Sequence, residues 1–172
     1  MNPEQNPIPL IHSQLEVTKQ IWSLFQQSYK VEAELIGSDD FPPLRRTVEN
    51  IQASDSVFVG IIDQETTTDQ ELIIAAAELS SDKNGNLSID SFAVSPARFR
   101  QGLGVVLMCD IISRNNEREI IVDTSILNHP AIAFYKKAGF EDRSTYTNKH
   151  GFDMIRLHYV AASRSDSSHV PA

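Results

Sequence analysis

The spacing of apolar residues predicts helices in the first third of the chain. Over residues 15–29 apolar side chains recur every three or four positions, the period of an amphipathic helix. A break that contains Gly37 follows, and a second, shorter helix is predicted over residues 44–52. A short strand is predicted before both, over residues 9–12.

From residue 56 onward the pattern changes to that of strands. Compact apolar runs cover residues 57–62, 71–79 and 87–94, and short polar turns separate them. The second turn contains Asn84-Gly85, the strongest short signal for a β-hairpin. The three runs are therefore predicted to form an antiparallel meander.

Strand and helix alternate in the C-terminal half. The predicted elements are a helix over residues 104–115, a strand over 119–124, a helix over 128–138, and strands over 140–147 and 152–159. The first of these helices is apolar on most sides, which predicts a helix buried against a sheet, with Cys109 as a buried, inert thiol. We expect one domain over residues 1–160 and a disordered tail over 161–172, because the tail is small and polar.

Composition and charge narrow the classes of function. The chain has 172 residues and a net charge of −8, which argues against a nucleic-acid binder that relies on a broad basic face. Its single cysteine excludes an intramolecular disulfide and fits a reducing compartment. No signal peptide, membrane span or histidine spacing typical of a metal site is visible. We expect a soluble, cytoplasmic protein without a metal.

A loop with two glycines follows the strand that ends at Val94. Gly102 and Gly104 stand where the next helix begins, and Arg98 and Arg100 precede them. Free amide groups and the positive dipole end of a helix favour an anion such as a diphosphate. Glycine leaves no Cβ in the way. The loop is a candidate phosphate site, although an ordinary tight turn accounts for the same residues.

Two common nucleotide-binding motifs do not fit this loop. A Walker A loop needs Gly-Lys-Ser/Thr, which is absent. A Rossmann fingerprint needs a third glycine three residues after Gly104, where Leu107 stands, and the preceding strands are predicted to be antiparallel.

Residues 92–105 resemble the central cofactor motif of the GNAT superfamily of acetyltransferases. The glycines match the end of the family's Gln/Arg-x-x-Gly-x-Gly/Ala element, with Phe99 at the usual Gln/Arg position. The resemblance implies acetyl-CoA as cosubstrate. The amides implied to hold its diphosphate are those of Arg100, Gln101, Gly102, Leu103, Gly104 and Val105, and the residues implied to face pantetheine are Phe92, Ala93 and Val94.

A second element, over residues 128–140, is similar to the family's Asn-x-x-Ala-x-x-Phe-Tyr-x-x-x-Gly-Phe. The resemblance implies that Asn128 contacts the pantetheine region, that Tyr135 protonates the departing thiolate and that Lys137 reaches the phosphates. A phenol holds its proton at neutral pH and can give it to a thiolate. Taken alone, Asn128 also reads as a helix cap and Tyr135 as a core aromatic.

The attacking amine needs a proton acceptor. Asp90, four residues before Val94, lies at a position where some GNAT branches carry an acid or a histidine. Glu78 on the preceding strand is the rival candidate. An unperturbed Asp is a weak base, so it would need burial or a water relay. Either residue could instead face solvent.

The resemblance implies an α/β fold: a mixed, mainly antiparallel central sheet of about seven strands, flanked by about four helices and splayed between the fourth and fifth strands. The implied reaction is transfer of an acetyl group from acetyl-CoA to a primary amine by direct attack, with no metal and no membrane. The acceptor is a small molecule or a peptide, and a homodimer is a family-level expectation.

The acceptor pocket is expected between the first helices and the last two strands. Its candidate residues are Tyr29, Glu32, Glu34, Asp39, Asp40, Phe41 and Tyr146. This acidic and aromatic mixture suits a cationic amine. Two alternatives stay open, a non-catalytic acyl-CoA sensor, which Phe99 favours, and an interaction domain that keeps only the fold.

Overall fold

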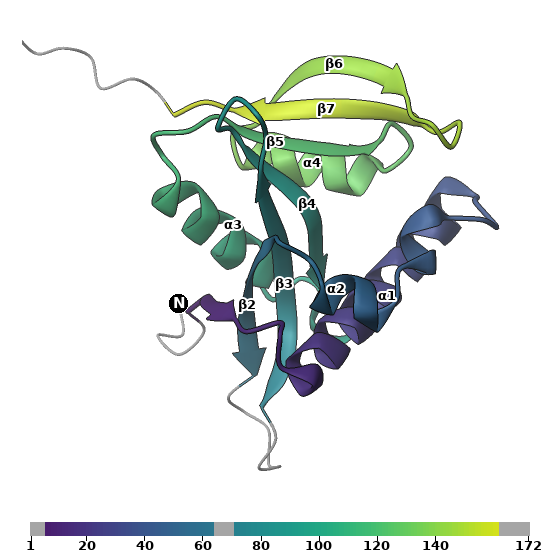
Figure 1. The fold of residues 1–172 in the computed structure, drawn as a ribbon. Coiled ribbons are helices and arrows are strands. Elements are labelled where there is room, and N and C mark those ends of the chain that lie inside the picture. The colour runs from purple at the N-terminus through teal and green to yellow at the C-terminus, as the bar shows by residue number, and fades with distance from the viewer. Residues whose placement is uncertain (1–5, 64–70, 162–172) are drawn as a thin grey trace, which may run out of the picture.

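The computed structural model describes residues 6–63 and 71–161 (Figure 1). The turn predicted at 64–70 and the tail predicted from residue 162 lie outside these ranges. The described strands are β1 (Ile8–Leu10), β2 (Val57–Asp63), β3 (Leu72–Ser81), β4 (Leu87–Val94), β5 (Ile120–Ser125), β6 (Glu141–Thr147) and β7 (Asp153–Tyr159). The described helices are α1 (Leu15–Ile36), α2 (Val48–Gln52), α3 (Leu103–Arg114) and α4 (His129–Lys137), with short 3-10 turns at Pro42–Arg45 and Pro96–Arg98.

The strands form one seven-stranded sheet in the order β1-β2-β3-β4-β5-β7-β6. Only β4 and β5 are parallel, and every other neighbouring pair is antiparallel. The mixed, mainly antiparallel sheet, the meander β2–β4 and the flanking helices are thus confirmed.

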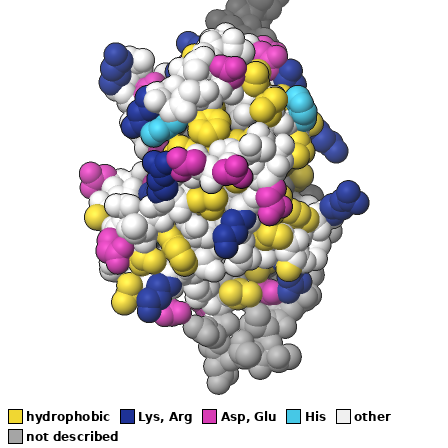
Figure 2. Space-filling model, turned by 90° about the vertical axis from the view of Figure 1, so that its right-hand side faces the viewer, with side chains coloured by type: hydrophobic (Ala, Val, Ile, Leu, Met, Phe, Trp, Pro, Cys, Tyr) yellow, Lys and Arg dark blue, Asp and Glu magenta, His cyan; other side chains and the backbone are white. Residues whose placement is uncertain are grey.

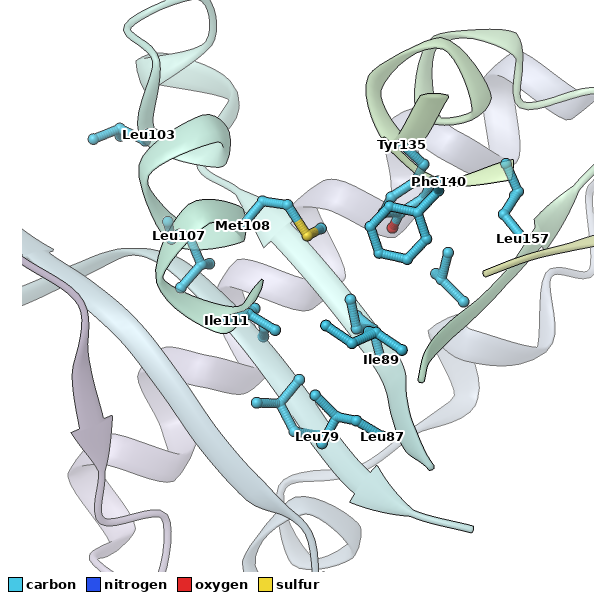
Figure 3. Close-up of a cluster of buried hydrophobic side chains, with 14 of the residues drawn as sticks. Leu79, Leu87, Ile89, Leu103, Leu107, Met108, Ile111, Tyr135, Phe140 and Leu157 are labelled. Atoms are coloured by element: carbon cyan, nitrogen blue, oxygen red, sulfur yellow. The ribbon is translucent and has the colours of Figure 1, made fainter. Parts of the chain in front are cut away.

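Two apolar cores lie on opposite faces of the sheet. In β3 the alternation of side chains sends Ala76 to the core under α1 and α2, and Ala75 and Ala77 to the core under α3 and α4. Figure 1 shows α1 and α2 on one side of β2–β4 and α3 on the other. Figure 3 shows the second core, where side chains of α3 meet Tyr135, Phe140 and Leu157.

The helical predictions need two corrections. Helix α1 continues past Tyr29 to Ile36 and ends at Gly37, whose left-handed backbone (φ 67°) closes the helix. The predicted helix over 44–52 begins only at Val48. Thr47 caps it, accepting a hydrogen bond from the Asn50 amide at 3.2 Å, and a 3-10 turn stands before it. Local capping therefore places the boundaries where apolar periodicity did not.

Helix α3 packs against the sheet, as its sequence predicted, but along one side only. Leu103, Leu107, Met108 and Ile111 are buried, but Cys109 is exposed. The prediction of a buried thiol was wrong because the helix covers only one face of the sheet, and its other side meets solvent.

The parallel pair β4–β5 holds together over a short stretch only. Its pairing ends at Ile89 and Val122, and the remaining residues of both strands have no cross-strand partner in that direction. In Figure 1, β5, β7 and β6 run across the direction of β2–β4. The predicted splay between the fourth and fifth strands is confirmed.

A β-bulge lies directly beyond the last paired residue of β4. Ile89 pairs with Leu79 and Ser91 pairs with Glu78, which leaves Asp90 as the extra residue. The bulge shifts the alternation by one position. Ile89 and Phe92 therefore both face the core under α3 and α4.

The described helices include none that is long and apolar enough to cross a membrane. On the face shown in Figure 2, Lys and Arg side chains are interspersed with Asp and Glu and form no continuous basic area. This face offers no support for binding nucleic acid through charge.

Candidate active site

A cavity of about 640 Å³ opens where β4 and β5 part. Its walls come from α1 on one face of the sheet and from α3 and α4 on the other, which is feasible only because the strands separate. The residues that line it include Tyr29 and Glu32 of α1, Asp90 and Phe92 of β4, Asp123 of β5, Arg98 to Arg100 and Gly102 to Val105 of the loop and α3, and Asn128, Phe134 and Tyr135.

The loop at the start of α3 carries two left-handed residues. Gly102 has φ 81° and Arg100 has φ 64°, a value that is uncommon for a residue with a side chain. No side chain caps α3, and the Val106 amide, which donates to the Gly102 carbonyl at 3.0 Å, is the first to enter the helical ladder. The amides of residues 100–105 have no acceptor in the described part of the chain. Such a run of open donors at a helix N-terminus is suited to an anion.

Two arginines add positive charge at this end of the cavity. Arg98 pairs with the buried Asp63, which fixes its side chain beside the loop. Arg100 is exposed and makes no ion pair with the residues that the structure describes. Phe99 lies between them and is 48% exposed at the cavity.

The two glycines differ in what they permit. A Cβ on Gly102 would meet nothing within 4 Å, so space does not require a glycine at this position. Its left-handed backbone does, because residues with a side chain rarely adopt it. A Cβ on Gly104 would lie 3.5 Å from the Phe134 ring and 3.6 Å from Val94, an ordinary contact. The absent side chain of Gly104 leaves room beside Phe134 in the wall of the cavity.

The end of β4 supplies the middle of the cavity wall. Phe92 and Val94 line it, whereas Ala93 points to the opposite face and is buried under α1. The β5-facing backbone of this stretch lies beyond the last paired residue, Ile89. The predicted pantetheine residues therefore border the gap, and Ala93 contributes backbone only.

Asn128 both caps helix α4 and lines the cavity. Its Oδ1 accepts a hydrogen bond from the Ala131 amide at 3.2 Å and caps α4. The side chain is also 9% exposed and lines the cavity, where it interacts with Glu32.

Tyr135 is buried in an aromatic cluster at the cavity wall. Its ring centroid lies 5.4 Å from Phe134, 5.6 Å from Phe140 and 6.4 Å from Phe92. Burial, with the nearby Glu32 and Tyr29, raises its pKa well above the ordinary value. The hydroxyl has no hydrogen-bond partner among the residues of 6–63 and 71–161, so its proton is available to a bound group.

The two residues predicted as proton acceptors have different surroundings. Asp90 is exposed at the bulge, lines the cavity and accepts a hydrogen bond from Ser88 at 2.6 Å. Glu78 does not line the cavity and is buried against Arg46. Burial alone would raise the pKa of Glu78, but Arg46 and two serines hold it below the ordinary value. Glu78 therefore belongs to a structural ion pair, whereas Asp90 remains a candidate.

Several predicted site residues lie elsewhere. The side chains of Gln101 and Lys137 are exposed and do not line the cavity, although the Gln101 amide belongs to the open run of donors. Of the acceptor candidates, Tyr29 and Glu32 line the cavity. The others, Glu34, Asp39, Asp40, Phe41 and Tyr146, do not line it.

Sequence reasoning missed Asp123 altogether, and it named Glu32 as an acceptor candidate but ended the first helix at residue 29, before Glu32. Asp123 follows the apolar core of β5, and its position opposite β4 depends on a pairing that only the fold sets. Glu32 lies one turn beyond Tyr29 on the same side of α1, which a longer helix prediction would have shown.

The sequence profile of the acetyltransferase (GNAT) family matches residues 18–140, well over half of the chain, and this segment contains most of the cavity wall. The chain belongs to the acetyltransferase (GNAT) family. The curated relative UPF0157 protein YqkA of Bacillus subtilis (strain 168) is 32% identical over 151 residues. That match covers 87% of this chain and 42% of the relative, so the chain spans less than half the length of that protein.

Solved GNAT structures share the fold. The ribosomal-protein-S18-alanine N-acetyltransferase from Escherichia coli superposes with a TM-score of 0.67 at 16% identity, covering 96% of this chain and 99% of that one. A GNAT family acetyltransferase from Elizabethkingia anophelis with acetyl-CoA bound superposes with a TM-score of 0.52 at 18% identity, covering 60% and 74%. At these identities the likeness concerns the fold.

No group of three or more His, Cys, Asp or Glu side chains in residues 6–63 and 71–161 is arranged to hold a metal ion.

Proposed function

We propose that this cavity binds acetyl-CoA and that the protein transfers the acetyl group to a primary amine by direct attack. The observation that carries the proposal is the run of open amides over residues 100–105, at one end of a cavity that reaches Tyr135. A diphosphate at the loop, with its extended arm along Phe92 and Val94, would direct the thioester toward Tyr135.

The residues of the cavity fit the chemistry of such a transfer. Donors at the start of α3 would bind negative charge, with Arg100 adding a cation. The unpaired edge of β4 would hold an amide-containing arm by backbone hydrogen bonds. The Tyr135 hydroxyl, kept protonated by burial, would give its proton to the leaving thiolate.

The acceptor is the less constrained part of the proposal. Acidic residues, Glu32, Asp90 and Asp123, line the cavity, and they favour a cationic amine over an anionic acceptor. Small-molecule and peptide amines both fit this description. Lys137 as a phosphate ligand, a homodimer and a cytoplasmic location stay predictions.

Calorimetric titration with acetyl-CoA and with coenzyme A tests the proposal. We expect binding in the micromolar range, and its loss in the variant Gly102→Val, which forces a β-branched residue into a left-handed backbone. Absence of binding at millimolar ligand would reject the acetyltransferase proposal.

A non-catalytic acyl-CoA sensor is the second candidate, favoured by Phe99 at the usual Gln/Arg position. A sensor would bind acetyl-CoA and release no thiol with any amine. Release of coenzyme A thiol in the presence of an amine would exclude it.

A further inference from the structure

Three carboxyl groups line the cavity and could receive a proton from an amine. They come from three elements: Glu32 from α1, Asp90 from β4 and Asp123 from β5. Asp123 is already engaged, because Arg156 donates to it at 2.7 and 2.8 Å and Tyr146 donates at 2.9 Å. Both of its carboxylate oxygens are thus occupied by the side chains of the neighbouring strands β6 and β7.

Asp90 is a weak candidate on its geometry. It is exposed at the bulge, where solvent surrounds its carboxylate, and it already accepts a hydrogen bond from the Ser88 hydroxyl at 2.6 Å.

Glu32 is placed differently. It is partly buried and lines the cavity from α1, as does Tyr29 one turn earlier, and it lies close enough to Tyr135 of α4 to add to the effect of burial in raising the pKa of that hydroxyl. Burial raises its pKa above the ordinary value, an effect that the neighbouring Asn128 side chain partly offsets. A carboxylate whose pKa lies closer to neutrality is a better proton acceptor.

We propose that Glu32 is the general base of the transfer and Tyr135 the general acid, so that an acid–base pair spans the cavity from α1 to α4. This inference rests on the proposed function and assigns a residue to its proton transfer. It places the acceptor amine between Glu32 and the thioester.

The proton balance of the step is complete. The nitrogen of the neutral amine bonds to the acetyl carbon and gives one N–H proton to the Glu32 carboxylate. The carbon–sulfur bond breaks, and the departing thiolate takes the hydroxyl proton of Tyr135. The products are an amide and coenzyme A thiol, and proton transfer from the Glu32 carboxylic acid to the Tyr135 phenolate restores both residues.

The test compares Glu32→Gln with Asp90→Asn and with Glu117→Gln, a matched control at an exposed residue outside the cavity. Release of coenzyme A thiol from acetyl-CoA is measured with 1,4-diaminobutane, tyramine, free lysine and a short alanine-initiated peptide, and with water alone. Loss of a general base lowers kcat by about 100-fold or more, and we expect this for Glu32→Gln only. Acetyl-CoA binding, measured by calorimetry, should be unchanged in all three variants.

The pH profile separates a base from a merely structural residue. The titratable or charged groups that face Glu32 across the cavity are Tyr29, Asp90, Arg98, Arg100, Asp123 and Tyr135. In the wild-type protein, kcat/KM should fall on acidification as the Glu32 carboxylate takes up a proton. In Glu32→Gln this limb should vanish, and the remaining activity should follow deprotonation of the amine itself.

The outcomes distinguish the two proposals. An active wild-type protein with a Glu32→Gln variant that matches the control overturns the role of Glu32 and leaves the proposed function standing. A loss in Asp90→Asn alone restores Asp90 as the base. A wild-type protein that binds acetyl-CoA but releases no thiol with any probe overturns the transfer function, and the role of Glu32 with it.

Discussion

At the scale of single residues, two glutamates show how surroundings change the same carboxyl group. Glu78 is buried and Glu32 is partly buried, and their pKa values move in opposite directions. Burial acts to raise both pKa values, but the Arg46 guanidinium beside Glu78 brings the pKa of that carboxyl below its ordinary value. The direction of each pKa shift depends on whether a cation lies beside the carboxyl group, and the fold decides which side chains lie there.

Tyr135→Phe tests the proposed acid. The variant keeps the ring contacts with Phe134 and Phe140 and loses only the hydroxyl. We expect kcat to fall by about 100-fold or more, with unchanged affinity for acetyl-CoA in calorimetry. Tyr159→Phe makes the same change away from the cavity and should be fully active. Equal activity of the two variants would remove Tyr135 from the mechanism.

Arg46→Met tests the buried ion pair. Glu78 would keep its place without its cation, and we expect the free energy of unfolding at pH 7 to fall by about 3 kcal/mol, the low end for a broken buried pair. A quarter of the Arg46 side chain is exposed (25%), which moderates the effect. Arg45→Met, whose pair with Asp40 is exposed, should change stability by at most about 1 kcal/mol.

The pH dependence of this loss follows from the lowered pKa of Glu78. The paired carboxylate stabilises the wild-type protein above its unfolded-state pKa, and this stability is lost as the pH falls through the folded-state pKa. The gap between the wild-type protein and Arg46→Met should therefore narrow in urea unfolding as the pH falls below 4.5, the ordinary glutamate pKa. A gap that stays constant would show that Arg46 stabilises the fold through packing.

At the scale of elements, short irregularities build the site. The bulge at Asp90 turns Phe92 toward the core and cavity on the side of α3 and α4, and the left-handed loop opens the amides in front of α3. Neither feature disrupts the sheet or the helix. The bulge lies directly after the stretch of β4 that pairs with β5, and the loop lies at the start of α3, and both border the cavity.

Gly102→Ala tests the loop. A Cβ at this position meets no atom within 4 Å, so the cost is backbone strain, about 1–2 kcal/mol in the free energy of unfolding. Gly104→Ala adds the same methyl group at an ordinary contact distance and should lower stability by less than that. Urea unfolding measures both variants. A larger loss in Gly104→Ala would contradict the assigned roles.

At the scale of the whole molecule, the cavity joins the two faces of the sheet. Residues of α1 and of α3 and α4 reach the same space only through the gap between β4 and β5. A ligand that fills this gap would tie both cores together. Its binding should therefore stabilise the entire domain.

Thermal unfolding with ligand tests this coupling. Acetyl-CoA at about 100 times its Kd should add about 2.7 kcal/mol and raise Tm by roughly 5–10 °C. Pantetheine, which lacks the diphosphate, should give a smaller shift at equal concentration, because it leaves the amides at the start of α3 unfilled. Equal shifts would place the binding energy outside the loop.

The sequence by itself determined the class of fold and the two segments that build most of the cavity wall. Apolar periodicity located the strands, and the glycines with Asn128 and Tyr135 marked segments that line the cavity, because these signals are local and survive without tertiary context. Prediction from the sequence failed for features that depend on contacts between residues distant in the chain. The length of α1, the exposure of Cys109 and the role of Glu78 as a partner of Arg46 are examples.

Only the tertiary structure decided which carboxyl groups share the cavity. Glu32 and Asp123 are separated by most of the chain, and they meet because β4 and β5 part beyond Ile89 and Val122. The state of each acid then depends on burial and on its partner, Arg156 for Asp123 and Asn128 for Glu32. Such surroundings arise only when the sheet, its bulge and its covering helices are assembled.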